Sequence, residues 1–143
     1  MLIKQVSVFL ENKRGRIEKV TKCLADEGIN IRALSIADTT DFGILRMILS
    51  DPDQAGSVLR ENGFTVTITD VIALTVDDQP GGLSRALSII GKNNIGIEYI
   101  YAFIGKSQGK AQVVLRTETP ETSAKLLQEA GYEVLDSIHA YAM

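Results

Sequence analysis

The sequence predicts an α+β protein built from two tandem copies of one unit. Three observations support this: short runs of alternating apolar residues typical of strands, segments with apolar residues at helical spacing, and landmarks that recur at a nearly constant distance along the chain. Each copy has the order strand, helix, strand, strand, helix, strand. This is the order of a split βαβ, ferredoxin-like unit, in which two helices cover one face of a four-stranded antiparallel sheet.

The first copy covers residues 1–70. Alternating apolar residues predict its first strand over residues 4–10. Apolar spacing then predicts a helix from Ile17 to about Glu27, which Gly28 ends because glycine readily adopts the conformation of a helix stop. The further elements expected are strands over residues 29–36, 42–49 and 64–69, a hairpin turn at 38–41, and a helix that Pro52 opens and Asn62 and Gly63 end.

The second copy, residues 71–143, repeats this order. Five pairs of landmarks are each separated by 66 positions: Gly15 and Gly81, Ile17 and Leu83, Ile29 and Ile95, Ile31 and Ile97, and Gly43 and Gly109. Two later pairs are separated by 68 positions: Pro52 and Pro120, and Gly63 and Gly131. These spacings predict a tandem duplication with two residues inserted near residues 117–119.

The connection between the copies is very short. Only Asp70 and its neighbours separate the last strand of the first copy from the first strand of the second, and no linker rich in glycine, proline or serine intervenes. We therefore expect the copies to pack together, most simply edge to edge in a continuous eight-stranded sheet, which would also protect strand edges. The strand-to-helix turns of both copies would then lie near one seam.

Composition and charge narrow the class of protein. A net charge of −3 and a pI near 5.2 argue against a binder of nucleic acid. One cysteine, Cys23, cannot form an internal disulfide and is expected to pack in the first helix, and the single histidine, His139, is expected at the surface without a metal site. The sequence has neither a signal-peptide pattern nor an apolar run of the length a membrane helix needs, so we expect a soluble, cytoplasmic protein.

Residues 77–83 form the stretch of the sequence that most strongly suggests a binding site. They follow an apolar strand and open an apolar-periodic helix; Pro80 suits a first helical turn, and Gly81 and Gly82 allow close approach of another group to the backbone. A helix that begins here directs N–H groups and the positive end of its dipole outward, which favours a carboxylate or a phosphate. The alternative is an ordinary helix start, with Asp78 as a cap.

These residues resemble the ACT domain family of small ligand-binding modules. The resemblance covers nearly the whole chain and rests on an acidic residue, a glycine turn and an aliphatic residue at the helix start, followed by an isoleucine-rich start of the second strand. In the second copy these are Asp77, Pro80, Gly81, Leu83 and residues 94–97, and in the first copy Glu11, Gly15, Ile17 and residues 28–31.

The resemblance implies an effector site at the seam between two modules, where helix N–H groups hold the carboxylate of an amino acid. Carried over by position, the ligand-binding residues are Asn12, Arg14, Gly15, Arg16 and Ile17 in the first copy and Asp78, Gln79, Pro80, Gly81, Gly82 and Leu83 in the second. Arg14 departs from the family pattern, which has proline there. Arg14 and Arg16 could clamp a carboxylate or be solvated.

An aromatic row distinguishes the second copy. Tyr99, Tyr101 and Phe103 alternate along its second strand, and the matching residues of the first copy are small. A buried sheet face would explain the row, and an apolar ligand pocket or a dimer face are alternatives. We expect a homodimer, because an exposed row of this kind would otherwise face water.

The sequence thus predicts a non-catalytic regulatory protein that binds an amino acid or a related carboxylate, without a cofactor, and acts through a homodimer or a metabolic enzyme. One alternative is an association subunit that docks such an enzyme and binds no ligand. The other is a small ferredoxin-like enzyme of the acylphosphatase type, for which Asn12, Arg14 and Gly15 offer a reduced phosphate loop.

Overall fold

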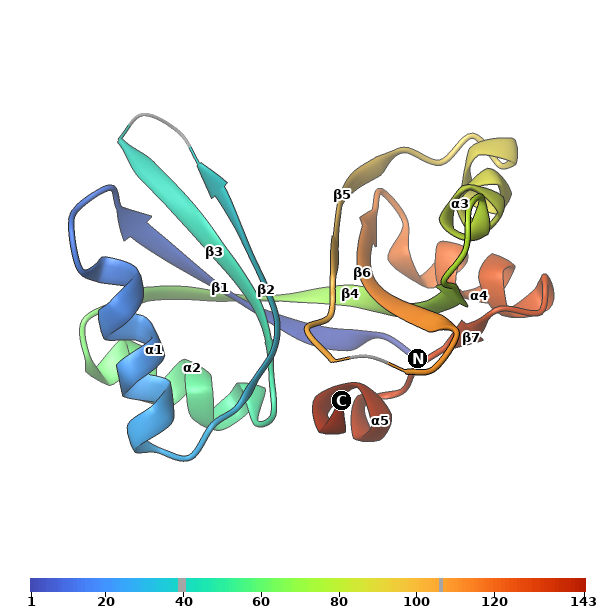
Figure 1. Cartoon of the computed structure of the whole chain (residues 1–143). Helices are drawn as coiled ribbons and strands as arrows, with labels where there is room; N and C mark the ends of the chain where they lie inside the picture. Colours follow the sequence, from blue (N-terminus) through green and yellow to red (C-terminus); the bar gives the residue numbers. More distant parts are fainter. Residues whose placement is uncertain (39–40, 106) are drawn as a thin grey trace. The chain divides into compact units, whose positions relative to one another are not determined.

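The computed structural model describes residues 1–38, 41–105 and 107–143, which form seven strands and five helices (Figure 1). The chain divides into two compact units. We call Lys4–Thr69 the N-terminal unit, and Asp70–Met143 together with Met1–Ile3 the C-terminal unit. The hairpin turn expected at residues 38–41 lies partly outside the described residues.

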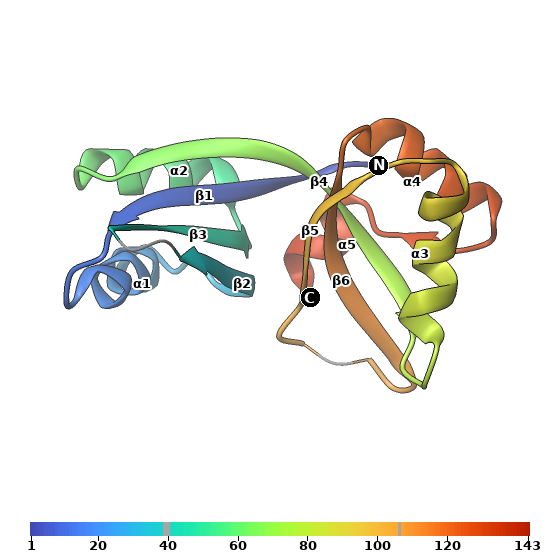
Figure 2. The same ribbon diagram turned by 90° about the horizontal axis from the view of Figure 1, so that it is seen from above.

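The N-terminal unit has the predicted element order. Its strands lie in the order β2, β3, β1, β4 (Figure 2), and β3 pairs antiparallel with both β1 and β2. This is the ferredoxin-like order expected from the sequence. The elements are β1 (Ile3–Glu11), α1 (Arg16–Asp26), β2 (Ile31–Asp38), β3 (Phe42–Leu49), α2 (Pro52–Glu61) and the first part of β4 (Thr65–Asp77).

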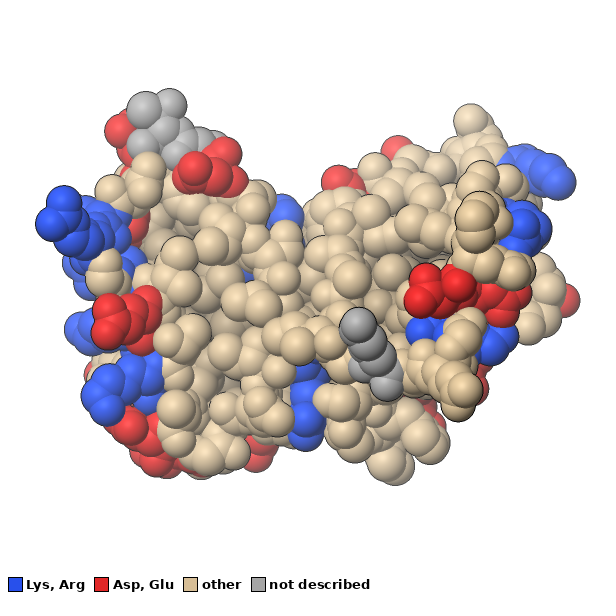
Figure 3. All heavy atoms as spheres, in the orientation of Figure 1, with Lys and Arg blue, Asp and Glu red and all other residues tan. Residues whose placement is uncertain are grey.

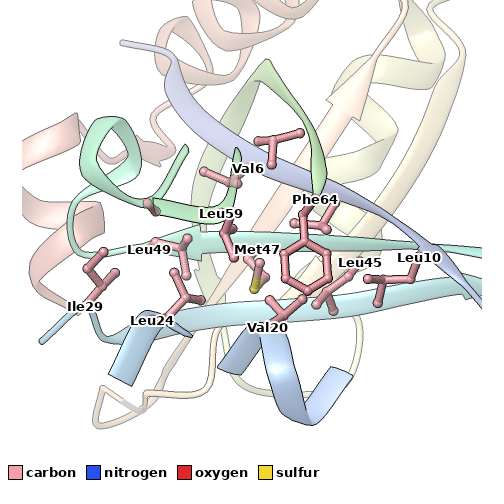
Figure 4. Packing of buried hydrophobic residues seen from close by; sticks show 13 residues of the cluster. Val6, Leu10, Val20, Leu24, Ile29, Leu45, Met47, Leu49, Leu59 and Phe64 are labelled. Atoms are coloured by element: carbon pink, nitrogen blue, oxygen red, sulfur yellow. The ribbon is translucent and has the colours of Figure 1, made fainter. Parts of the chain in front are cut away.

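One apolar core holds this unit together. The inward residues of β1 and β3 meet those of α1 and α2, as in the contact of Met47 with its neighbours in Figure 4. Cys23 is half-buried against this core, as the sequence predicted for a packing residue. The core residues are Val6, Val8, Leu10, Val20, Leu24, Ile29, Leu45, Met47, Leu49, Ala55, Leu59, Phe64 and Val66.

The C-terminal unit repeats the arrangement, with strand order β7, β4, β6, β5. Residues of α3 and α4, such as Ile90 and Leu127, pack on the inward side chains of β4 and β6, among them Leu74 and Leu115. The elements are the second part of β4, α3 (Gly82–Lys92), β5 (Ile97–Ala102), β6 (Lys110–Thr117), α4 (Pro120–Glu129), β7 (Glu133–Val134) and α5 (Ser137–Ala142).

Two strands expected from the sequence are a single strand. β4 runs without a break from Thr65 to Asp77, so the described residues form seven strands and the expected count of eight was wrong. Asp70, which was expected to separate two strands, is an exposed residue within β4. A lone aspartate disfavours a strand only weakly when ladders on both sides hold it extended. The edge-to-edge packing of the copies stays a prediction.

The two-residue insertion lies in a different place from the one expected. In the N-terminal unit Val8 pairs with Leu45, and in the C-terminal unit Leu74 pairs with Val113, so the third strands already differ by 68 positions. Matching residues of the second strands, such as Ile31 and Ile97, are still 66 positions apart in the sequence. The extra residues therefore belong to the connection between β5 and β6, and not to residues 117–119, and Gly43 corresponds to Ala111 rather than to Gly109.

The helix α5 was not predicted. Asp136 caps it by accepting a hydrogen bond from the backbone N–H of His139 at 2.9 Å, and a second contact joins Asp136 to His139 Nδ1 at 2.7 Å. The backbone N–H of Leu135 donates to the carbonyl of Ala73, which fixes the approach of the helix to β4. The side chain of His139 is exposed, as expected.

Candidate functional site

Two glycines shape the turn between β4 and α3. Gly81 has φ 81°, a left-handed conformation that side-chain-bearing residues rarely adopt, and it is the residue before the first turn of α3. Gly82 is buried, and a Cβ there would overlap the carbonyl oxygen of Asp77. Both positions therefore require glycine, each for its own physical reason.

The start of α3 has the features of an anion site. The backbone N–H of Gly82 donates to the carbonyl of Gln79 at 2.9 Å, and among the described residues no side chain caps the helix. The N–H groups of the first helical turn lack helical acceptors, and the dipole adds positive potential at this end. The turn can accept a carboxylate at this point.

Arg85 contributes a charge that the sequence analysis missed. Its guanidinium Nη1 lies 2.9 Å from the position that a Cβ on Gly81 would occupy, so the arginine folds back over the glycine. The matching residue of the first copy, Lys19, instead places its ammonium 5.5 Å from the centre of the Phe64 ring. The spacing of four residues between Gly81 and Arg85, one turn of a helix, was the signal that could have identified it.

Asp77, the last residue of β4, pairs with Lys110 at the start of β6. The hydrogen bond and the charge of Lys110 hold the pKa of Asp77 below its ordinary value, and the charge of Arg85 acts in the same direction. Asp77 is therefore an anion at neutral pH and holds Lys110 beside the turn.

A shallow groove runs from the turn along α3. It has a volume of about 640 Å³ and is lined by Gln79, Gly81, Leu83, Ser84, Leu87 and Ser88. Three of the predicted site residues, Gln79, Gly81 and Leu83, thus meet in one groove. Asp78 and Gly82 do not line it; the backbone N–H of Asp78 donates to the carbonyl of Gly109 at 3.1 Å.

The turn of the N-terminal unit has the same conformation with different contacts. Gly15 has φ 82°, but a Cβ there would meet open space. The N–H of Arg16 is 3.5 Å from the carbonyl of Lys13, a longer contact than the matching one at Gly82, where a Cβ would overlap the carbonyl oxygen of Asp77. Lys13 pairs with Glu11 at 2.8 Å.

The other predicted site residues of this turn have different surroundings. The backbone N–H of Asn12 donates to the carbonyl of Asp41 at 2.9 Å, and Ile17 is 42% exposed at the start of α1. Arg16 lines a small pocket beside Phe9 and Phe42. Basic side chains gather over α1 and the turn before it on the face in Figure 3.

The aromatic row is largely covered, in agreement with the buried sheet face that the sequence analysis gave as an explanation. Phe103 is 7% exposed, and Tyr99 and Tyr101 are half-buried with ring centroids 6.4 Å apart. The burial of Phe103 needs no second copy of the chain, so this residue no longer supports a homodimer.

The described residues offer neither a cluster of metal ligands nor a helix that could span a membrane. In the part of the chain that the structure describes, no group of three His, Cys, Asp or Glu side chains is placed to hold a metal ion. No described helix is long and apolar enough to cross a membrane.

Comparisons with known proteins agree with this architecture. A family model described as an ACT domain pair matches residues 1–139. Protein BT0572 from Bacteroides thetaiotaomicron is 40% identical, with 100% of this chain and 98% of that chain covered and a TM-score of 0.94. The chain therefore belongs to the ACT domain pair family.

More distant structures share the fold. The regulatory subunit of aspartate kinase from Thermus thermophilus, in a ligand-free form, is 15% identical, with 92% of this chain and 95% of that chain covered and a TM-score of 0.66. The corresponding subunit from Thermus flavus is 16% identical, with 91% and 95% covered and a TM-score of 0.60. No curated protein matches the chain.

Proposed function

We propose that this protein is a non-catalytic regulator that binds a small amino acid or a related carboxylate at the turn between β4 and α3. The observation that carries the proposal is the position of Arg85 over Gly81 at a helix start that no described side chain caps. A carboxylate there would receive hydrogen bonds from the helix N–H groups and the charge of the guanidinium.

The groove along α3 supplies the rest of the ligand site. Gln79 offers an amide oxygen to the α-ammonium group, and Leu83 and Leu87 offer apolar surface to a side chain. The family resemblance implies an effector site at a seam between modules, and we propose that a second module completes this groove. Binding then favours one arrangement of modules and shifts its population, which a partner enzyme or a second copy of the chain detects.

The proposal is tested by a thermal-shift screen against the twenty amino acids and related keto acids. A ligand at about 100 times its dissociation constant stabilises the native state by about 2.7 kcal/mol, which raises Tm by several degrees. Arg85→Lys, which introduces the residue of the first copy, is expected to reduce the shift, since lysine lacks the planar fork of arginine. Lys19→Arg is the matched control and should leave it unchanged.

A screen without any shift would contradict the proposal. The remaining candidate would then be the association subunit, which predicts copurification with a larger enzyme.

A further inference from the structure

The duplication places a pocket at the same position in each unit. The pocket of the N-terminal unit has a volume of about 190 Å³, and that of the C-terminal unit about 470 Å³. Both lie where the first and third strands approach the fourth. The shared positions are Phe9 and Thr75, Glu11 and Asp77, Phe42 and Lys110, Gly63 and Gly131, Phe64 and Tyr132, and Thr65 and Glu133.

The side chains of the two pockets differ in polarity. In the N-terminal unit Phe9 pairs across the strands with Ile44, and the rings of Phe9 and Phe42 lie 5.7 Å apart. In the C-terminal unit the corresponding strand pair is Thr75 with Gln112. The second copy therefore places a long amide side chain where the first has isoleucine.

Gln112 has an unused acceptor in this pocket. The residue is only 6% exposed; its Nε2 donates to Ser107 Oγ at 3.2 Å, while Oε1 is buried and has no hydrogen-bond partner among the described residues. A buried acceptor without a partner destabilises the folded state, and native proteins retain few of them. A donor that enters the pocket would remove this cost.

The carboxylate of Glu133, on the strand that flanks β4 opposite to β6, lines the same pocket as Gln112. Thr75 is paired with Gln112 on one side and with Glu133 on the other, so the three side chains share one face of the sheet. Thr75 Oγ1 donates to Glu133 Oε1 at 2.9 Å, and Glu133 and Gln112 both line this pocket. Across the described residues no cation pairs with Glu133, whereas Asp77 and Lys110 neutralise each other.

We propose that this pocket of the C-terminal unit binds a small molecule through a primary ammonium group, which donates to Gln112 Oε1 and to the carboxylate of Glu133. An ammonium group supplies the missing donor and the missing positive charge together, because it has three N–H bonds. A water molecule would supply a donor and no charge. This site is separate from the groove at the glycine turn, and it does not depend on the proposed function.

The test is a titration of the whole protein followed by NMR of backbone amides. Methylammonium chloride is compared with tetramethylammonium chloride at equal ionic strength, because the second ion has the same charge and no N–H group. We expect saturable shifts around Thr75, Gln112 and Glu133 with methylammonium alone. An absence of saturable shifts would mean that water fills the pocket, and equal shifts with both ions would mean attraction of charge only; either result overturns the proposal.

Variants locate the site. Gln112→Ile, which introduces the residue of the first copy, and Glu133→Gln are each expected to weaken methylammonium binding about tenfold. Glu133 is exposed, so its variant keeps the test valid if Gln112→Ile does not fold. Glu129→Gln removes an exposed carboxylate from α4 and should change nothing. Unaltered binding in Glu133→Gln would overturn the assignment.

One further probe, glycine, distinguishes an amino acid from a simple amine as the ligand. Glycine has the same ammonium group beside a carboxylate. Binding of glycine more tightly than methylammonium would identify an amino acid as the ligand, and equal or weaker binding would identify an amine.

Discussion

The backbone of Gly82 lies against the carbonyl oxygen of Asp77, so closely that no side chain fits between them. This contact closes the turn between the end of β4 and the start of α3. In the other unit, Arg16 occupies the matching position and the turn is looser, with a contact of 3.5 Å between Arg16 N and Lys13 O. The duplication has therefore produced one tight and one open version of the same turn.

Gly82→Ala is expected to destabilise the protein by about 1–3 kcal/mol, the usual cost of forcing an extra group into a packed site. Gly91→Ala is the matched control on the same helix, since a Cβ there meets open space, and it is expected to stabilise by about 0.5–1 kcal/mol. Urea denaturation of both variants measures these changes. A Gly82→Ala variant as stable as the control would contradict the close contact.

A buried hydroxyl pair provides a second prediction. Thr117 Oγ1 and Ser123 Oγ lie 2.7 Å apart and are fully buried, and the first copy has Leu49 and Ala55 at these positions. Thr117→Val and Ser123→Ala each leave one buried hydroxyl without its partner, so each is expected to cost about 1–3 kcal/mol.

The double variant removes both hydroxyls and is expected to cost less than the sum of the single variants, because no polar group is then left unpaired. A double-mutant cycle from denaturation curves measures this coupling. Additive losses would show that the hydroxyls do not depend on each other.

Local patterns in the sequence were sufficient to predict most of the helices and strands. Apolar periodicity placed the helices, and Gly28 has the positive φ of 69° that its role as a helix stop requires. The element α5 was missed, although Asp136 is an ordinary capping residue, because six residues carry too little apolar periodicity.

The contacts of the candidate site depend on pairings that a single sequence does not reveal. In the sequence, Gln112 is one polar residue within an apolar strand. Its place in a pocket depends on its pairing with Thr75 across the sheet, which the sequence does not reveal. Arg85 reads as a solvated helix residue, and Lys19 at the same position of the first copy turns elsewhere. Side-chain direction, unlike element type, is decided by tertiary neighbours.

The ion pair of Asp77 and Lys110 predicts a dependence on pH. Lys110 lowers the pKa of Asp77 in the folded protein, first through its hydrogen bond and then through its charge. The stability from this pair is therefore present above the unfolded pKa of about 3.9 and is lost as the pH falls through the folded pKa.

Lys110→Met is expected to raise the pKa of Asp77 toward its ordinary value, which a carboxyl NMR titration measures. Lys13→Met should raise the pKa of Glu11 in the same way and leave Asp77 unaffected, since Lys13 is the partner of Glu11. An unchanged pKa of Asp77 in Lys110→Met would exclude the pair as its cause.

The left-handed glycines that precede α1 and α3, Gly15 and Gly81, allow the effect of a substitution on folding to be separated from its effect on binding. Gly15→Ala and Gly81→Ala are each expected to lose about 1–2 kcal/mol, because an alanine at φ near 80° is strained. At Gly81 the new Cβ would also displace the guanidinium of Arg85, whereas at Gly15 it meets open space. Only Gly81→Ala should therefore reduce the thermal shift caused by the amino acid that stabilises the unmodified protein. An equal reduction in Gly15→Ala would place the carboxylate at both turns, and no reduction in either would remove it from both.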